Sequence, residues 1–249
     1  MKTLFLAWQS RGATRAWYPI GRLEADPGAH HYAFSYTMGA ERAGHDAGFQ
    51  PLVSFPELDK FYESSELFPL FQNRVLDPSR KDFAQYLEWL GLERGAADPI
   101  DILAVSGGER QTDNLEVFPL VEKAVDNSFR CRFFLHGHRH VSLSGIERAN
   151  RLDEREELRV SIELNNPATG LAIQLLSPEY EMVGWAPRYL VPSLVRAVAD
   201  APEVRAHVVR VNEPPAPSNR RVLVEFSGRW PADYEPMSEE VFRPLCSHA

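Results

Sequence analysis

Six short runs of apolar and β-branched residues between residues 131 and 228 constrain the fold of this 249-residue chain most strongly. Polar or turn-forming residues bound each run, which is typical of short β-strands. One amphipathic helix is expected among them, over 191–200, with Leu194, Val195 and Val198 on its apolar face. Closely spaced short strands predict a small β-barrel or sandwich. The expected strands are 131–138 (CRFFLHGH), 157–164 (ELRVSIEL), 170–177 (GLAIQLLS), 181–187 (EMVGWAP), 204–212 (VRAHVVRVN) and 221–228 (RVLVEFSG).

The first half of the sequence mixes strand and helix patterns. A helix is expected over 77–92, because Asp77 is a suitable N-cap and Gly91 a suitable terminator. Its apolar stripe has helical spacing and predicts a core-facing side, made of Phe83, Tyr86, Leu87 and Leu90. A shorter helix should end at Gly107. Strands are expected at 3–9 (TLFLAWQ), 15–24 (RAWYPIGRLE) and 31–37 (HYAFSYT). The predicted fold class is therefore α+β, with a small mixed α/β N-terminal domain.

The charge of the chain changes near residue 129. Residues 1–129 hold 12 Lys and Arg against 19 Asp and Glu, whereas residues 130–249 hold 15 Arg, no Lys, and 16 acids. We therefore expect a first domain over 1–128, a β-barrel over 129–232 and an acidic tail over 233–249, which either is partly disordered or packs back on the body. The overall charge of −8 argues against extensive, salt-driven coating of nucleic acid. It leaves room for a small arginine-lined pocket, because guanidinium forks match phosphate oxygens.

The segment HGHRH, residues 136–140, invites a metal hypothesis. On a β-strand, His136, His138 and His140 would point to one face and could bind zinc together with Cys131 or a carboxylate. The segment also resembles the last motif of calcineurin-like metallophosphoesterases. The Asp-x-His, Gly-Asp and Gly-Asn-His-acid motifs that a two-metal site of that family needs do not occur in the sequence. The prediction is therefore a chain without metal or other cofactor, and a metal-dependent phosphoesterase is only a remote alternative.

Other catalytic signatures are also missing from the sequence. It contains no G-x-S-x-G elbow, no P-loop and no G-x-G-x-x-G loop. No apolar run approaches the ~18 residues needed to cross a bilayer, and the two cysteines form no CxxC pair. We expect a non-catalytic, reduced, cytoplasmic protein without membrane contact.

Three segments of the second half resemble the HIRAN domain family: 133–149 (FFLHGHRHVSLSGIERA), 164–190 (LNNPATGLAIQLLSPEYEMVGWAPRYL) and 218–228 (SNRRVLVEFSG). The resemblance covers residues 130–230, and its most specific parts are the Asn-Pro segment and VGWAPRYL. It implies an OB- or SH3-like β-barrel that binds single-stranded DNA or a DNA end. Arg139 would hold a phosphate, His140 would take the place of a stacking aromatic residue, and Trp185, Arg188 and Tyr189 would line the pocket wall. The implied nucleic-acid-binding residues are Arg139, His140, Asn165, Asn166, Trp185, Arg188 and Tyr189.

Two adjacent positions depart from the family pattern. The eukaryotic DNA-end binders carry Tyr-Asp after the Asn-Pro pair, where this chain has Ala168 and Thr169. Because both the ring and the acid are missing, recognition of a free 3′-hydroxyl is in doubt.

The first half resembles the N-terminal subdomain of HipA-type toxins over residues 15–120. The resemblance rests on the collinear order of 17–25 (WYPIGRLEA), 31–37, the aromatic-rich stretch 49–93 and 98–119 (DPIDILAVSGGERQTDNLEVFP). That subdomain packs on a kinase core whose catalytic and magnesium-binding aspartates have no counterpart here after residue 130. The resemblance implies that this half docks a protein partner. The combined prediction is a bacterial DNA-binding adaptor in genome maintenance or defence; the alternative is a protein-only regulator or antitoxin of a HipA-like kinase.

Overall fold

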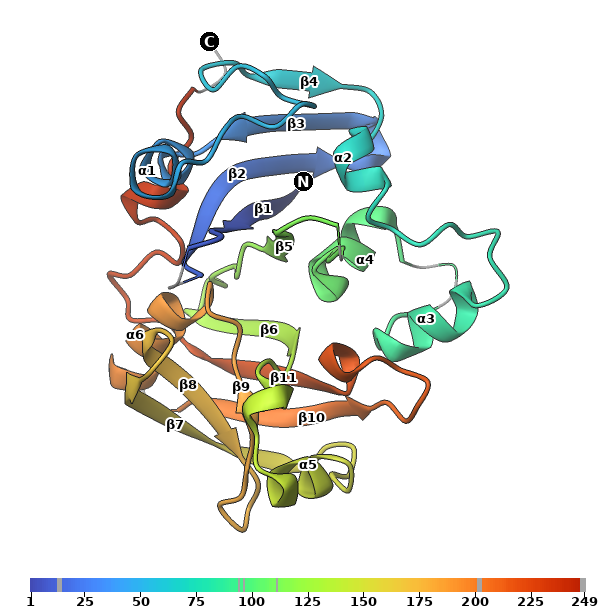
Figure 1. Cartoon of the computed structure of the whole chain (residues 1–249), viewed down its shortest axis with the longest axis vertical. Helices are drawn as coiled ribbons and strands as arrows, with labels where there is room; N and C mark the ends of the chain where they lie inside the picture. Colours follow the sequence, from blue (N-terminus) through green and yellow to red (C-terminus); the bar gives the residue numbers. More distant parts are fainter. Residues whose placement is uncertain (13–14, 94, 96, 111, 201–202, 247–249) are drawn as a thin grey trace. The chain divides into compact units, whose positions relative to one another are not determined.

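A computed structural model describes residues 1–12, 15–93, 95, 97–110, 112–200 and 203–246 of the chain. The contacts divide it into two compact units (Figure 1). Unit 1 comprises Met1–Ala84, Leu92–Leu120 and the segment from Met237 onward, and unit 2 comprises Gln85–Gly91 and Val121–Pro236. The domain boundaries expected from the sequence stay a prediction. Within the described ranges, no helix combines the length and the apolar character needed to cross a membrane.

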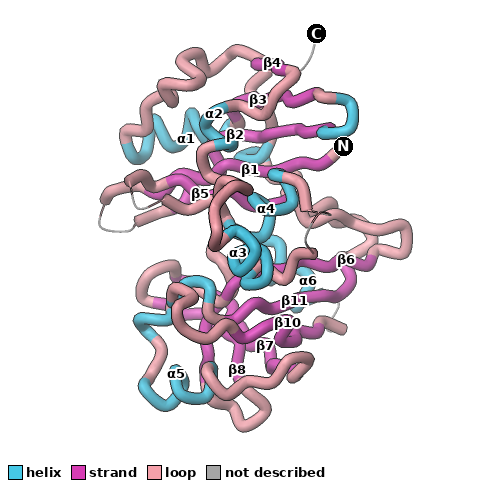
Figure 2. The backbone as a smooth tube through the Cα atoms, turned by 90° about the vertical axis from the view of Figure 1, so that its right-hand side faces the viewer, coloured by secondary structure: helices cyan, strands magenta, loops and turns pink. Residues whose placement is uncertain are grey.

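Unit 1 is built on a five-stranded antiparallel sheet with the strand order β4-β3-β2-β1-β5 (Figure 2). The three strands expected from the sequence are confirmed, and β4 and β5 complete the sheet. The strands are β1 (Lys2–Gln9), β2 (Trp17–Asp26), β3 (His31–Tyr36), β4 (Tyr62–Ser64) and β5 (Leu115–Pro119).

Helices and an aromatic cluster complete unit 1. Phe34 stacks on Phe55 at a centroid distance of 4.0 Å, and Phe71 and Tyr36 pack against Phe34. Asp98 caps one helix by accepting the N–H of Asp101 at 2.9 Å, and this helix ends at Gly107 as expected. The helical elements are α1 (Met38–Ala47), α2 (Pro69–Gln72), α4 (Pro99–Ser106), η1 (Pro27–Ala29) and η4 (Glu240–Phe242).

The C-terminal segment from Met237 to Cys246 is part of unit 1. Phe242 is buried, and its ring lies 5.0 Å from that of Phe5 and 6.5 Å from that of Phe118. Thr37 and Pro244 form an isolated bridge, and the N–H of Leu245 donates to the carbonyl of Tyr36 at 2.8 Å. Of the two possibilities for the tail, the described part therefore packs back on the body.

Helix α3 spans Phe83–Trp89, which corrects the expected start near residue 77. The carboxylate of Asp77 accepts the N–H of Ser79 at 2.8 Å in a turn and caps no helix. The expected apolar stripe is largely confirmed, because Tyr86, Leu87 and Leu90 are buried, and Gly91 ends the segment with φ +64°.

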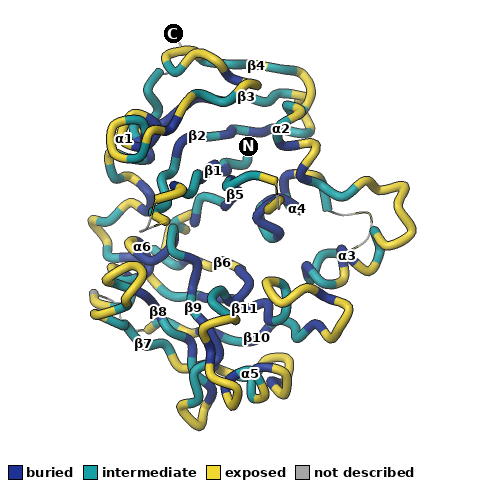
Figure 3. The backbone as a smooth tube through the Cα atoms, in the orientation of Figure 1, coloured by how far each residue is buried: buried dark blue, intermediate teal, exposed yellow. Residues whose placement is uncertain are grey.

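Unit 2 is built on a six-stranded antiparallel sheet with the strand order β6-β11-β10-β7-β8-β9. All six expected strands are present, and α6 coincides with the expected helix. Buried and exposed residues alternate along the first part of β6, so one side of this strand is apolar and the other polar (Figure 3). The elements are β6 (Ser128–Phe134), η2 (His138–His140), α5 (Leu143–Ala149), β7 (Glu157–Asn166), β8 (Gly170–Leu176), β9 (Met182–Trp185), α6 (Val191–Asp200), β10 (Arg205–Val211), η3 (Ser218–Arg220) and β11 (Val222–Arg229).

The two edge strands of this sheet approach each other at one point. His136, just beyond β6, forms an isolated bridge with Trp185 at the end of β9. Their backbone hydrogen bonds measure 2.9 and 3.1 Å. Gly184 permits the approach, because a Cβ there would lie 2.9 Å from the Cβ of Leu135. No ladder closes the sheet over the described residues. The α+β class is confirmed, and a closed barrel is not shown.

Candidate nucleic-acid interface

The HGHRH segment is a turn and not a strand. Gly137 adopts φ +76°, in the left-handed region that favours glycine, and residues 138–140 form the single 3-10 turn η2. The N–H of His140 donates to the carbonyl of Gly137 at 2.7 Å. The expectation that three histidines share one strand face is therefore wrong, because the strand ends before Gly137.

Trp185 packs directly on this turn. A Cβ added at Gly137 would lie 2.4 Å from Cε3 of the indole, so the ring occupies the space a side chain would need. Together with the His136–Trp185 bridge, this contact joins the HGHRH segment to VGWAPRYL, although the two are distant in the sequence. The structure thus brings together two of the motifs singled out in the sequence.

Arg139 and His140 are exposed at the tip of the turn. The Nε of Arg139 donates to Nε2 of His140 at 3.0 Å, so the guanidinium and the imidazole lie side by side. His138 is half-buried, and burial, with Arg221 nearby, lowers the pKa of its imidazole. His138 is therefore favoured in its neutral form, whereas the guanidinium of Arg139 is accessible at the surface.

Arg188 and Tyr189 lie in the turn that leads from β9 into α6. This turn is fixed by the N–H of Leu190 donating to the carbonyl of Pro187 at 3.0 Å. Both side chains are half-buried, and the Tyr189 ring lies edge-on to His136 at 6.4 Å. Tyr189 is therefore close to the turn that carries Arg139.

Glu163 holds the Trp185 ring in place. One carboxylate oxygen, Oε2, accepts the indole Nε1–H of Trp185 and the Nδ2–H of Asn166, each at 2.9 Å. The hydrogen bond from Asn166, helped by those from Trp185 and Gln174, lowers the pKa of the Glu163 carboxyl. This residue was missed in the sequence, because it is simply one polar position in a β-strand until the sheet register is known.

Asn165 and Asn166 have different surroundings. Asn165 is exposed, whereas the Oδ1 of Asn166 accepts the N–H groups of Ala168 and Thr169 at 3.0 and 3.1 Å and the Thr169 hydroxyl at 3.0 Å. The amide of Asn166 is thus engaged in forming the β7–β8 turn and in holding Glu163. Its placement is that of a positioning residue, while Asn165 is available to a ligand.

The structure gathers no set of metal-binding side chains in the parts it describes. No group of three or more His, Cys, Asp or Glu residues there could hold an ion. Cys131, considered as a fourth ligand, is buried on β6, and burial raises the pKa of its thiol to about 12. The assembled groups are a guanidinium, an imidazole and aromatic rings, which suit phosphate binding and base stacking.

Comparisons with known proteins leave the family open. No family model and no curated protein matches the sequence. A crystal structure of a protein from Lactobacillus plantarum is similar over 41% of this chain and 96% of that one, with 12% identity and a TM-score of 0.32. A similarity this weak carries no argument about fold or function.

Proposed function

We propose that unit 2 binds single-stranded DNA through the turn at residues 137–140 and the segment at 185–189, and that the chain acts as a non-catalytic adaptor. The observation that carries the proposal is the contact between Gly137 and the Trp185 ring. This contact brings the turn that carries the exposed guanidinium of Arg139 against the indole of Trp185. The Tyr189 ring lies close to the same turn, because it packs edge-on against His136. Phosphates and bases of a single strand are recognised by such a combination.

The resemblance to HIRAN domains supports the same function. In the proposed barrel, β6 and β9 are the strands that would close the sheet, and the bridge between His136 and Trp185 lies where they would meet. Arg188, His140 and Asn165 complete the proposed surface, with Asn166 shaping the turn beside it. Because Ala168 and Thr169 replace the family's ring and acid, we expect little preference for a free 3′-hydroxyl over a 3′-phosphate.

We expect Arg139→Ala to weaken binding of a short single-stranded oligonucleotide by about 1–3 kcal/mol, the range for a charge-assisted hydrogen bond. Fluorescence anisotropy at low and moderate salt measures this loss. The logarithm of the binding constant should fall with the logarithm of the salt concentration with a slope of only about two or three, because few phosphates are neutralised. Arg151→Ala is a matched control, because Arg151 is an exposed arginine just beyond the end of α5. No detectable binding at low salt, or equal weakening by both substitutions, would contradict the proposal that unit 2 binds single-stranded DNA.

Unit 1 is proposed to dock a protein partner. The resemblance to the HipA N-terminal subdomain supports this role, as does the excess of seven acids over bases in residues 1–129. A pull-down from native cells with and without nuclease tests it. A partner retained after nuclease treatment supports direct docking by the chain. Partners recovered only when nucleic acid is intact would contradict the docking role.

A further inference from the structure

A second cluster of cations lies on the polar side of β6 in unit 2. Arg130 and Arg132 are two residues apart on β6, so their side chains share one face. Glu225 on β11 pairs in register with Arg132. The Glu225 side chain is only 6% exposed, whereas that of Arg130 is 71% exposed and that of Arg132 40%. A buried carboxylate thus lies beneath two accessible guanidinium groups.

Glu225 positions both arginines through their Nε atoms. Its Oε2 lies 2.8 Å from Nε of Arg132, and its Oε1 lies 3.2 Å from Nε of Arg130 and 3.7 Å from Nε2 of His207. An Nε contact leaves the distal Nη groups of each guanidinium for another acceptor. One arginine would suffice to neutralise Glu225, so the second guanidinium adds positive charge beside this carboxylate.

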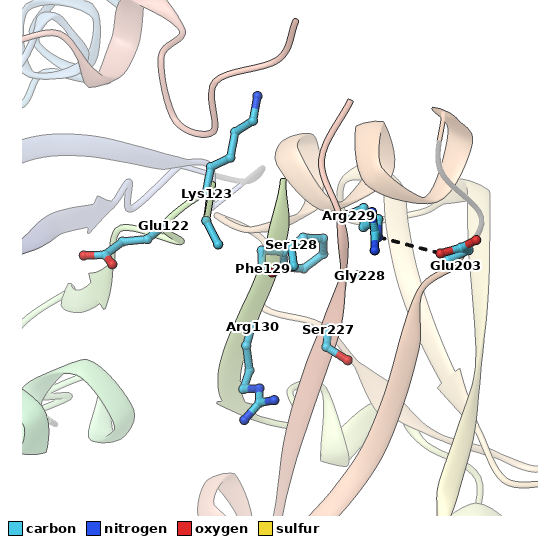
Figure 4. Close-up of a pocket in the computed structure, with 10 residues that line it drawn as sticks. Glu122, Lys123, Ser128, Phe129, Arg130, Glu203, Ser227, Gly228 and Arg229 are labelled. Carbon is cyan, nitrogen blue, oxygen red and sulfur yellow. Dashed lines mark ion pairs between the residues drawn. The ribbon is translucent and has the colours of Figure 1, made fainter. Parts of the chain in front are cut away.

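A cavity borders this cluster. It has a volume of about 570 Å³, and its lining includes three cations, two acids and a hydroxyl: Lys123, Arg130, Arg229, Glu122, Glu203 and Ser227 (Figure 4). Ser227 pairs in register with Arg130 on one side and with Arg205 of β10 on the other. Arg229 is held only loosely, 3.8 Å from the exposed Glu203. A hydroxyl flanked by two arginines, next to a ligand-sized hollow, is a suitable environment for a doubly charged anion.

We infer that Arg130, Arg132 and Ser227 form a second anion site, which binds phosphate groups, with Glu225 as the residue that positions the two arginines. The phosphate belongs either to a small molecule or to a nucleic-acid strand. The site shares no residue with the Arg139 surface, so an experiment can contradict one of the two sites without contradicting the other.

Titration of the intact chain with inorganic pyrophosphate, followed by calorimetry at low salt, tests the inference. Arg130→Gln should bind about tenfold more weakly, because a charge-assisted contact is lost. This substitution leaves Arg132 paired with Glu225, so folding should be preserved. Arg159→Gln is the control, because Arg159 is an exposed arginine of the same sheet that lies over the Tyr180 ring. Unchanged affinity in Arg130→Gln, equal loss in the control, or no binding by the unaltered chain would overturn the inference.

A triple variant excludes a purely structural effect. Replacing Arg130, Arg132 and Glu225 together by glutamine removes the ligand groups without leaving a buried charge unpaired. Its melting temperature should stay close to that of the unaltered chain while pyrophosphate binding is lost. Retained binding in this variant would contradict the site.

Competition distinguishes the two sources of phosphate. In the Arg139→Ala background, a short single-stranded oligonucleotide that displaces pyrophosphate would support the site as a contact for nucleic-acid phosphates. Retention of pyrophosphate at saturating oligonucleotide would support a small phosphate ligand.

Discussion

Replacing Phe242 with alanine is expected to lower the free energy of unfolding of unit 1 by about 3–5 kcal/mol, the range for a buried phenylalanine. The residue is 7% exposed, and its ring packs on Phe5 of β1 and Phe118 of β5. Its loss leaves a cavity beside both strands. Chemical denaturation followed by intrinsic fluorescence measures the change.

Arg243→Ala provides the control for this experiment. Arg243 is adjacent in sequence but exposed, and its guanidinium pairs with the exposed Glu240, three residues away. Such a surface change should fall within about 0.5 kcal/mol. A loss below about 1 kcal/mol for Phe242→Ala, well short of the range for a core phenylalanine, would show that the C-terminal segment does not contribute to the core of unit 1.

Gly137→Ala is expected to destabilise unit 2 by about 2–4 kcal/mol and to reduce DNA binding at least about tenfold. Two costs combine: left-handed backbone costs alanine about 1 kcal/mol or more, and forcing the Trp185 ring aside costs about 1–3 kcal/mol. The displaced ring would also part from Glu163. Unfolding by denaturant gives the first value, and anisotropy with a short oligonucleotide gives the second.

Gly170→Ala separates these two costs. Gly170 has φ +72°, close to that of Gly137, but a Cβ there meets nothing within 4 Å. This control should therefore lose only the backbone contribution and should leave DNA binding unchanged. Equal destabilisation and equal binding in the two variants would mean that the Gly137–Trp185 contact is not important.

The strands of this chain were largely predictable because local alternation reports on burial directly. The six runs of the second half and the three of the first half all form strands. Helix α1 was not predicted, because the residues that it buries are small and give no apolar stripe in the sequence. They are Gly39, Ala40 and Ala43. The start of α3 was misplaced because Asp77 makes a local side-chain turn that competes with capping.

The candidate site was predictable only in part. The predicted strand ran through Gly137 to residue 138, although glycine within a strand pattern often marks a break or a close approach of another segment. The partnership of Glu163 with Trp185 depends on the register of β7, β8 and β9, in which Gln174 lies opposite Trp185. The contact depends on how three strands pair in the fold, so the spacing of Glu163 and Trp185 in the sequence does not reveal it.

The central claim is that one surface, formed by residues 136–140 and 185–189, binds single-stranded DNA. Amide hydrogen exchange of the full chain, with and without a saturating short oligonucleotide, tests it most directly. We expect slower exchange in both segments together, and the effect should disappear in Arg139→Ala. Binding that leaves both segments unchanged, or that protects only unit 1, would contradict the claim.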